Sequence, residues 1–201
     1  MVALGMLVFW LSAAISVLVA GPAAPAGRPD RATVETRLRA NTLPTSAAEW
    51  QALGPGTDEI LVAIAGDAKA DLQLRLHAVG ALGVTSTRAG RALLESVVKQ
   101  KAASADAGDK LLLRKAALAL GWAGGNAVPA QIGPLLDHPD PDVRIDAAIG
   151  LGLTRSEEAA DRLRKRFDVE TVPKVRNQIG RQIRLIDEAV AAAKPSPPAP
   201  Q

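Results

Sequence analysis

The residues best suited to chemistry lie in one short stretch, Asp137-His138-Pro139-Asp140-Pro141-Asp142. Three carboxylates and one imidazole within six residues could ligate a divalent cation. However, the stretch follows no known ligand spacing. It also carries the features of a turn and a helix start, with Asp140 as N-cap and Pro141 in the first helical position. We therefore interpret it as a turn, and we predict no metal site and no catalytic residue.

Two other side chains that could contact a ligand are His77 and Trp122. His77 occupies a helical position that holds Lys115 and Asp146 in the related segments described below, which indicates an ordinary surface residue. Trp122 follows Gly121 at a position that is aliphatic in the related segments. We therefore expect its ring to fill space beneath a turn rather than to contact a ligand.

A basic stretch is the strongest indication of a binding surface. Nine positive side chains lie between residues 155 and 184, against five acidic ones. Such a patch could dock an acidic protein surface, an anionic lipid or a cell-wall polymer, and the alternative is a solvated face of helices. The candidate binding residues are Arg155, Arg162, Lys165, Arg166, Arg176 and Arg181.

The composition excludes several classes of function. The net charge is only +3, and two Phe, three Trp and no Tyr leave little aromatic surface for stacking on bases, so no nucleic-acid partner is predicted. The chain has no cysteine, which removes disulfides, thiolate catalysis, Cys-ligated metals and lipid attachment at an N-terminal Cys. No cofactor is predicted.

Residues 1–27 contain no charged side chain, whereas the chain is normally charged from Arg28 onward. This predicts a signal peptide or a membrane anchor. Cleavage after Ala26 or Ala23, which end small-x-small patterns, is favoured. The basic segment expected before a signal peptide is missing, however, and an uncharged run of this length can also remain as a membrane-spanning helix. Both outcomes predict a periplasmic or extracellular body.

The body is organised by a repeat. Segments 71–98, 109–136 and 140–167 align without a gap at seven positions. Each segment begins with Asp, followed by an aliphatic residue 3 positions later, Ala 7 positions later, Leu 11 positions later and Gly 12 positions later, and it ends with two further apolar positions. Offsets of 3, 7 and 11 form one stripe of a helix, so each segment predicts a helical hairpin. The predicted N-caps are Asp71, Asp109 and Asp140, and the predicted helix stops are Gly83, Gly121 and Gly152.

Less regular segments flank and interrupt the repeats. Residues 28–45 are predicted to be a linker, 46–66 a degenerate first repeat, 172–193 a capping helix and 194–201 a disordered, Pro-rich tail. Seven extra residues between the first two regular repeats, around Lys99–Gly108, predict a loop. Asn126 and Ser156 are predicted caps of second helices, and Pro134 should kink or end its helix.

The run DPDVRIDAAIGLG at residues 140–152 resembles the HEAT-like repeat, in the short form also found in phycobilisome bilin lyases. The resemblance extends from about Ser46 to Ile186. It implies an all-α fold, a right-handed α-solenoid of about four hairpins within residues 46–193, whose second helices line a concave ligand face. The matching positions are packing residues, so they do not name a reaction.

The leading hypothesis is an exported, non-enzymatic protein-interaction scaffold. Its protein partner is unidentified, and an acidic partner is one candidate. One alternative is a scaffold tethered to a membrane through residues 1–27. Another, implied by the resemblance, is an enzyme of the lyase or DNA-glycosylase type, although such enzymes act in the cytoplasm and this chain carries a leader.

Overall fold

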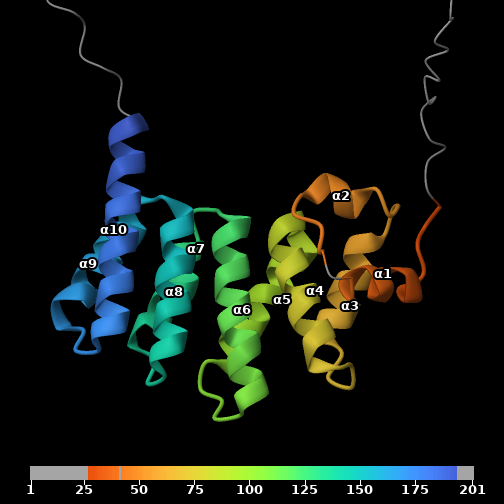
Figure 1. The fold of residues 1–201 in the computed structure, drawn as a ribbon, viewed down its shortest axis with the longest axis horizontal. Coiled ribbons are helices and arrows are strands. Elements are labelled where there is room, and N and C mark those ends of the chain that lie inside the picture. The colour runs from red at the N-terminus through yellow and green to blue at the C-terminus, as the bar shows by residue number, and fades with distance from the viewer. Residues whose placement is uncertain (1–26, 41, 194–201) are drawn as a thin grey trace, which may run out of the picture.

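The computed structural model describes residues 27–40 and 42–193, and within them the chain is helical with no strand (Figure 1). The predicted tail and nearly all of the predicted leader lie outside these residues. Among the described helices, none is both long and apolar enough to cross a membrane. The elements are α1 (Arg31–Leu38), α2 (Ala47–Gln51), α3 (Thr57–Gly66), α4 (Leu72–Thr85), α5 (Arg88–Lys101), α6 (Ala107–Ala123), α7 (Val128–Ile132), the 3-10 helix η1 (Gly133–Asp137), α8 (Pro141–Thr154), α9 (Glu157–Val169) and α10 (Pro173–Ala193).

The helices form a row of packed pairs. We call α4, α6, α8 and α10 the first helices, because they stand side by side and each packs against the next (Figure 1). The second helices, α5, α7 with η1, and α9, each pack against the first helix that follows them. Fully buried leucines recur at the repeat positions Leu82, Leu120 and Leu151, so the core continues from pair to pair as in other stacked repeats.

The predicted helix stops at Gly83, Gly121 and Gly152 are wrong, because each of these first helices continues beyond its glycine. The glycines instead permit close helix contact. A Cβ added at Gly83 would lie 2.7 Å from the Cα of Ala119, and one at Gly121 would collide with the backbone of Gly150. Side-chain-free positions let helices approach in this way.

Three of the five predicted N-caps are confirmed, and two are wrong. Asp71, Asp140 and Ser156 are N-caps as expected. Asp109 is not, because α6 begins earlier: Asp106 accepts from the Asp109 amide at 2.8 Å. Asn126 is not a cap either, since α7 starts after Ala127 without a side-chain cap.

The sequence predicts two irregularities in the repeats, a break at Pro134 and a loop around Lys99–Gly108. The interruption predicted at Pro134 is confirmed, because α7 ends at Ile132 and the chain continues as the 3-10 helix η1. The loop predicted around Lys99–Gly108 is shorter than expected, since α5 extends to Lys101 and α6 begins at Ala107. Ser104 closes this turn by donating to the Asp109 carboxylate at 2.9 Å.

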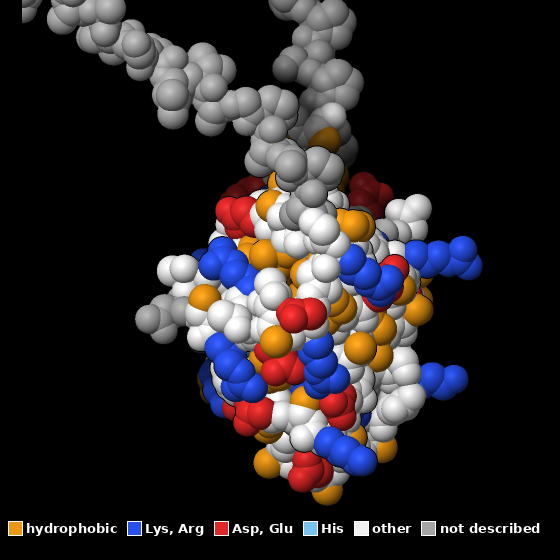
Figure 2. Space-filling view, turned by 90° about the vertical axis from the view of Figure 1, so that its right-hand side faces the viewer, with side chains coloured by type: hydrophobic (Ala, Val, Ile, Leu, Met, Phe, Trp, Pro, Cys, Tyr) orange, Lys and Arg blue, Asp and Glu red, His pale blue; other side chains and the backbone are white. Residues whose placement is uncertain are grey.

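The N-terminal end departs from the regular hairpin. The segment predicted as a linker contains α1, whose Val34 and Leu38 are buried. The helix α3 takes the position of a second helix, packing against α4 and α5, whereas the short α1 and α2 take the place of a first helix. A five-residue α2 cannot cover all of α4. At this end of the row, Lys and Arg side chains are interspersed with Asp and Glu rather than forming a patch of one sign (Figure 2).

Candidate binding surface on the first helices

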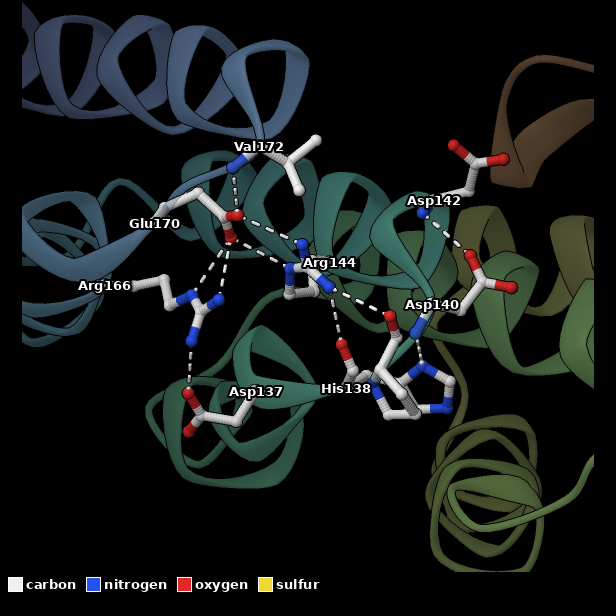
Figure 3. Close-up of polar contacts among 9 residues, drawn as sticks. Asp137, His138, Asp140, Asp142, Arg144, Arg166, Glu170 and Val172 are labelled. Atoms are coloured by element: carbon white, nitrogen blue, oxygen red, sulfur yellow. Dashed lines mark hydrogen bonds and ion pairs between the residues drawn. The ribbon is translucent and has the colours of Figure 1, made fainter.

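The cluster at residues 137–142 is built around a buried ion pair (Figure 3). Arg144 donates to both carboxylate oxygens of Glu170, at 2.9 and 3.0 Å, and to the carbonyl oxygen of His138 at 2.8 Å. The Glu170 side chain is 0% exposed and that of Arg144 is 8% exposed. A bidentate pair of this kind fixes the turn against the start of α10.

Electrostatics favour the ionised form of Glu170. Burial alone would raise the pKa of its carboxyl, but hydrogen bonds from Arg144, the Val172 amide and Arg166 outweigh burial and lower the pKa from 4.5 to about 2. Hydrogen bonds to a carboxylate stabilise its charged form in this way.

The other carboxylates of the cluster also have structural partners (Figure 3). Asp137 accepts from Arg166 at 2.8 Å, Asp140 accepts from the Asp142 amide at 2.9 Å, and the Asp142 carboxylate accepts from Lys174 at 2.8 Å. The residues that seemed able to bind a cation are therefore used by the turn and the helix start, as the turn interpretation predicts.

The predicted basic patch is divided by the structure. Arg162 pairs with Glu158, Arg166 pairs with Glu170 and Asp137, and Arg176 lies over the Phe167 ring at 4.4 Å from its centroid. The remaining candidates are exposed and form no ion pair with a described residue: Arg155, Lys165 and Arg181.

Trp122 is exposed, so the predicted role as a plug beneath a turn is wrong. Its side chain is 69% exposed. It stands at a groove of about 420 Å3 between α4, α6 and the segment before α2. The groove exists because α2 is too short to cover α4. Most of its wall is apolar: Leu43, Pro44, Trp50, Val84, Leu118 and Trp122.

The same face extends along the row. Positions four, seven and eleven residues after Gln73, Leu111, Asp142 and Lys174 form one stripe on each first helix, and residues of the first two stripes line the groove. We call these four stripes the first-helix face. They comprise Gln73, His77, Gly80 and Val84; Leu111, Lys115, Leu118 and Trp122; Asp142, Asp146, Ile149 and Leu153; and Lys174, Gln178, Arg181 and Leu185.

The exposed apolar side chains of the described residues concentrate on this face. Four large hydrophobic residues are exposed in this part of the chain, and three lie on the face: Leu111 at 41%, Trp122 at 69% and Leu185 at 46%. Only Val169, at the end of α9, lies elsewhere. Large exposed apolar side chains gathered on one face of a protein are typical of interaction sites. Most of the exposed large apolar side chains thus lie on the first helices, whereas the resemblance implies a ligand face on the second helices.

Most polar groups on the face are satisfied internally. Asp146 accepts from Arg114 at 2.6 Å, and burial raises the pKa of its carboxyl despite this bond. His77 is not an ordinary surface residue: its Nδ1 donates to the carbonyl oxygen of Leu38 at 2.6 Å, which ties the end of α1 to α4. Lys115 and Arg181 differ, since neither forms an ion pair with any described residue.

One signal in the sequence could have identified the face. The core stripe of α6 contains Leu112, Ala116 and Leu120. Trp122 is two residues past Leu120, about 200° further around the helix, so it points away from the core. Matching Trp122 to aliphatic residues of the other repeats hid this, because those positions, Val84 and Leu153, are themselves only half-buried.

The row of stacked helical pairs defines a helical repeat protein. Residues 101–184, from the end of α5 into α10, match the family model for HEAT repeats. The predicted resemblance is thereby confirmed. The comparison with curated proteins found no match.

Proposed function

We propose that the protein is an exported, non-enzymatic scaffold, a right-handed α-solenoid that binds a partner protein through its first-helix face. The observation that carries this proposal is Trp122. Its large aromatic side chain is exposed beside an apolar groove, where residues of this type commonly anchor a protein partner. The HEAT repeats provide a rigid row on which such a surface can be displayed.

Export is supported by residues 1–27, which carry no charged side chain. A secreted or periplasmic body and a body tethered by an uncleaved helix both follow from this pattern. The intact mass of the protein isolated from cells distinguishes the two: loss of the first 23 or 26 residues indicates a free protein, and retention indicates a membrane-tethered scaffold.

A binding role is also supported by how the reactive groups are used. The carboxylates and the imidazole of residues 137–142 cap a helix, close a turn and pair with Arg166 and Lys174. In this arrangement their polar atoms serve the fold. On the first-helix face, in contrast, Lys115 and Arg181 are exposed and form no ion pair with a described residue.

Photo-cross-linking tests the proposal. A photoreactive phenylalanine analogue at position 122 should form a discrete adduct with one envelope protein in intact cells. The matched control places the analogue at Val169, the exposed apolar residue outside the face. Equal adduct patterns at the two positions, or no adduct at position 122, would show that the face is not a binding surface.

A further inference from the structure

The first-helix face combines apolar surface with unpaired positive charge. Lys115 lines the groove beside Trp122, and Arg181 occupies the corresponding surface of α10, one helical turn before Leu185. Neither cation forms an ion pair with a described residue, whereas both carboxylates of the face are paired, Asp142 with Lys174 and Asp146 with Arg114. The face therefore offers positive charge and no unpaired negative charge.

We propose that the first-helix face binds an acidic, apolar segment of another protein in an extended conformation, an inference that rests on the proposed function. The apolar side chains of this segment pack on Trp122, Leu153 and Leu185. Its carboxylates pair with Lys115 and Arg181. Complementary charge of this kind selects a partner and orients it.

The spacing of the helices sets the length of the segment. Two steps between neighbouring helices separate α6 from α10, and packed helix axes are about 8–10 Å apart. The two cations are thus on the order of 20 Å apart, which about six extended residues span. Because the apolar residues between them come from three successive helices, a segment of this length crosses the row rather than following one helix.

Synthetic peptides test the chemistry of the partner. The probes are three ten-residue peptides of one design: one of Leu, Pro and Glu, one with Lys in place of Glu, and one with Ser in place of Leu. Each peptide is titrated into the protein as isolated from cells, and binding is measured by calorimetry. The Leu/Glu peptide should bind about tenfold more tightly than either other peptide. Its affinity should fall as salt screens the ion pairs.

Charge reversal separates recognition from folding. In the double variant K115E/R181E the preference should switch to the Leu/Lys peptide, a gain that a misfolded protein cannot show. The variant R181E alone, at an exposed position, should lower affinity for the Leu/Glu peptide by about threefold. The matched control is K99E on α5, an exposed cation of a second helix that forms no ion pair with a described residue, which should leave the affinity unchanged.

Several results would overturn the proposal. They are equal binding of the three peptides, no switch in the double variant, and tighter binding of a peptide with the sequence of residues 194–201, which would make the chain's own tail the occupant. A dimer that dissociates in the Trp122→Ala variant would make the face a self-association surface. If these results occur while position 122 still cross-links to an envelope protein, the binding scaffold stands and only the acidic partner is wrong.

Discussion

The turn around Arg144 and the first-helix face contain similar charged residues and use them in opposite ways. At the turn, Arg144 and Arg166 both pair with the carboxylate of Glu170, whose side chain is fully buried. On the face, Lys115 and Arg181 are exposed beside apolar side chains and pair with no described residue. Charge density along the sequence therefore did not distinguish a structural cluster from a binding surface, whereas pairing and burial do.

The difference follows from position in the repeat. The turn lies between consecutive helical pairs. Asp137 at the end of η1, Arg144 of α8 and Arg166 of α9 come together there around Glu170 (Figure 3). The face lies on the outside of the first helices, where each stripe has a neighbour only to either side. Charges inside the row must be paired because desolvation is costly, whereas a charge on its surface can stay unpaired, as Lys115 and Arg181 do.

The largest expected effect comes from breaking the buried pair. Replacing Glu170 by Ala leaves the Arg144 guanidinium buried without its carboxylate, and this should lower the free energy of unfolding by about 3–5 kcal/mol. Urea denaturation followed by circular dichroism measures it. The double variant R144L/E170L should lose less than E170A, because it removes both charges. A smaller loss in the single variant than in the double would contradict the assignment of this pair as structural.

The pH dependence of stability sharpens the same contrast. The pKa of Glu170 is about 2 in the folded chain and 4.5 ordinarily, so its contribution is fully present above pH 4.5 and disappears as the pH falls towards 2. The shift corresponds to about 3 kcal/mol. Denaturant midpoints measured between pH 6 and 2 should fall more steeply in the wild type than in E170Q. Parallel curves for the two proteins would rule out the lowered pKa.

A smaller effect is expected where the first helices touch. A methyl group at Gly121 would meet the backbone of Gly150, so Gly121→Ala should destabilise the chain by about 1–3 kcal/mol. The control is Gly66→Ala, because the nearest atom to its added Cβ, on Leu93, lies 3.8 Å away. The control should be neutral or slightly stabilising, since Ala favours helix over Gly. Similar losses in both variants would mean that helix propensity and not close packing explains Gly121.

Gly121 also shows what the sequence could and could not predict. The sequence identified the hairpins, the N-caps Asp71, Asp140 and Ser156, and the break at Pro134, since these depend on local periodicity and on the properties of individual residue types. A Leu-Gly pair at a helix end looks the same whether the glycine ends the helix or admits a neighbour, and only the distance to Gly150 decides. The ion pair between Arg166 and Asp137, which are 29 residues apart in the sequence, is equally a matter of tertiary contact. Exposure of Trp122, in contrast, was within reach of a helical-wheel argument.

The smallest expected effect on stability is at the proposed binding residue itself. Because Trp122 is exposed, Trp122→Ala should change the free energy of unfolding by no more than about 0.5 kcal/mol. Trp50, which is 1% exposed and lines the same groove, should cost about 3–5 kcal/mol when replaced by Ala. Denaturation of both variants, with binding of the Leu/Glu peptide measured for Trp122→Ala, checks the pair. A stable Trp122→Ala protein that has lost the peptide places the ring in recognition, while a large loss of stability would place it in the core.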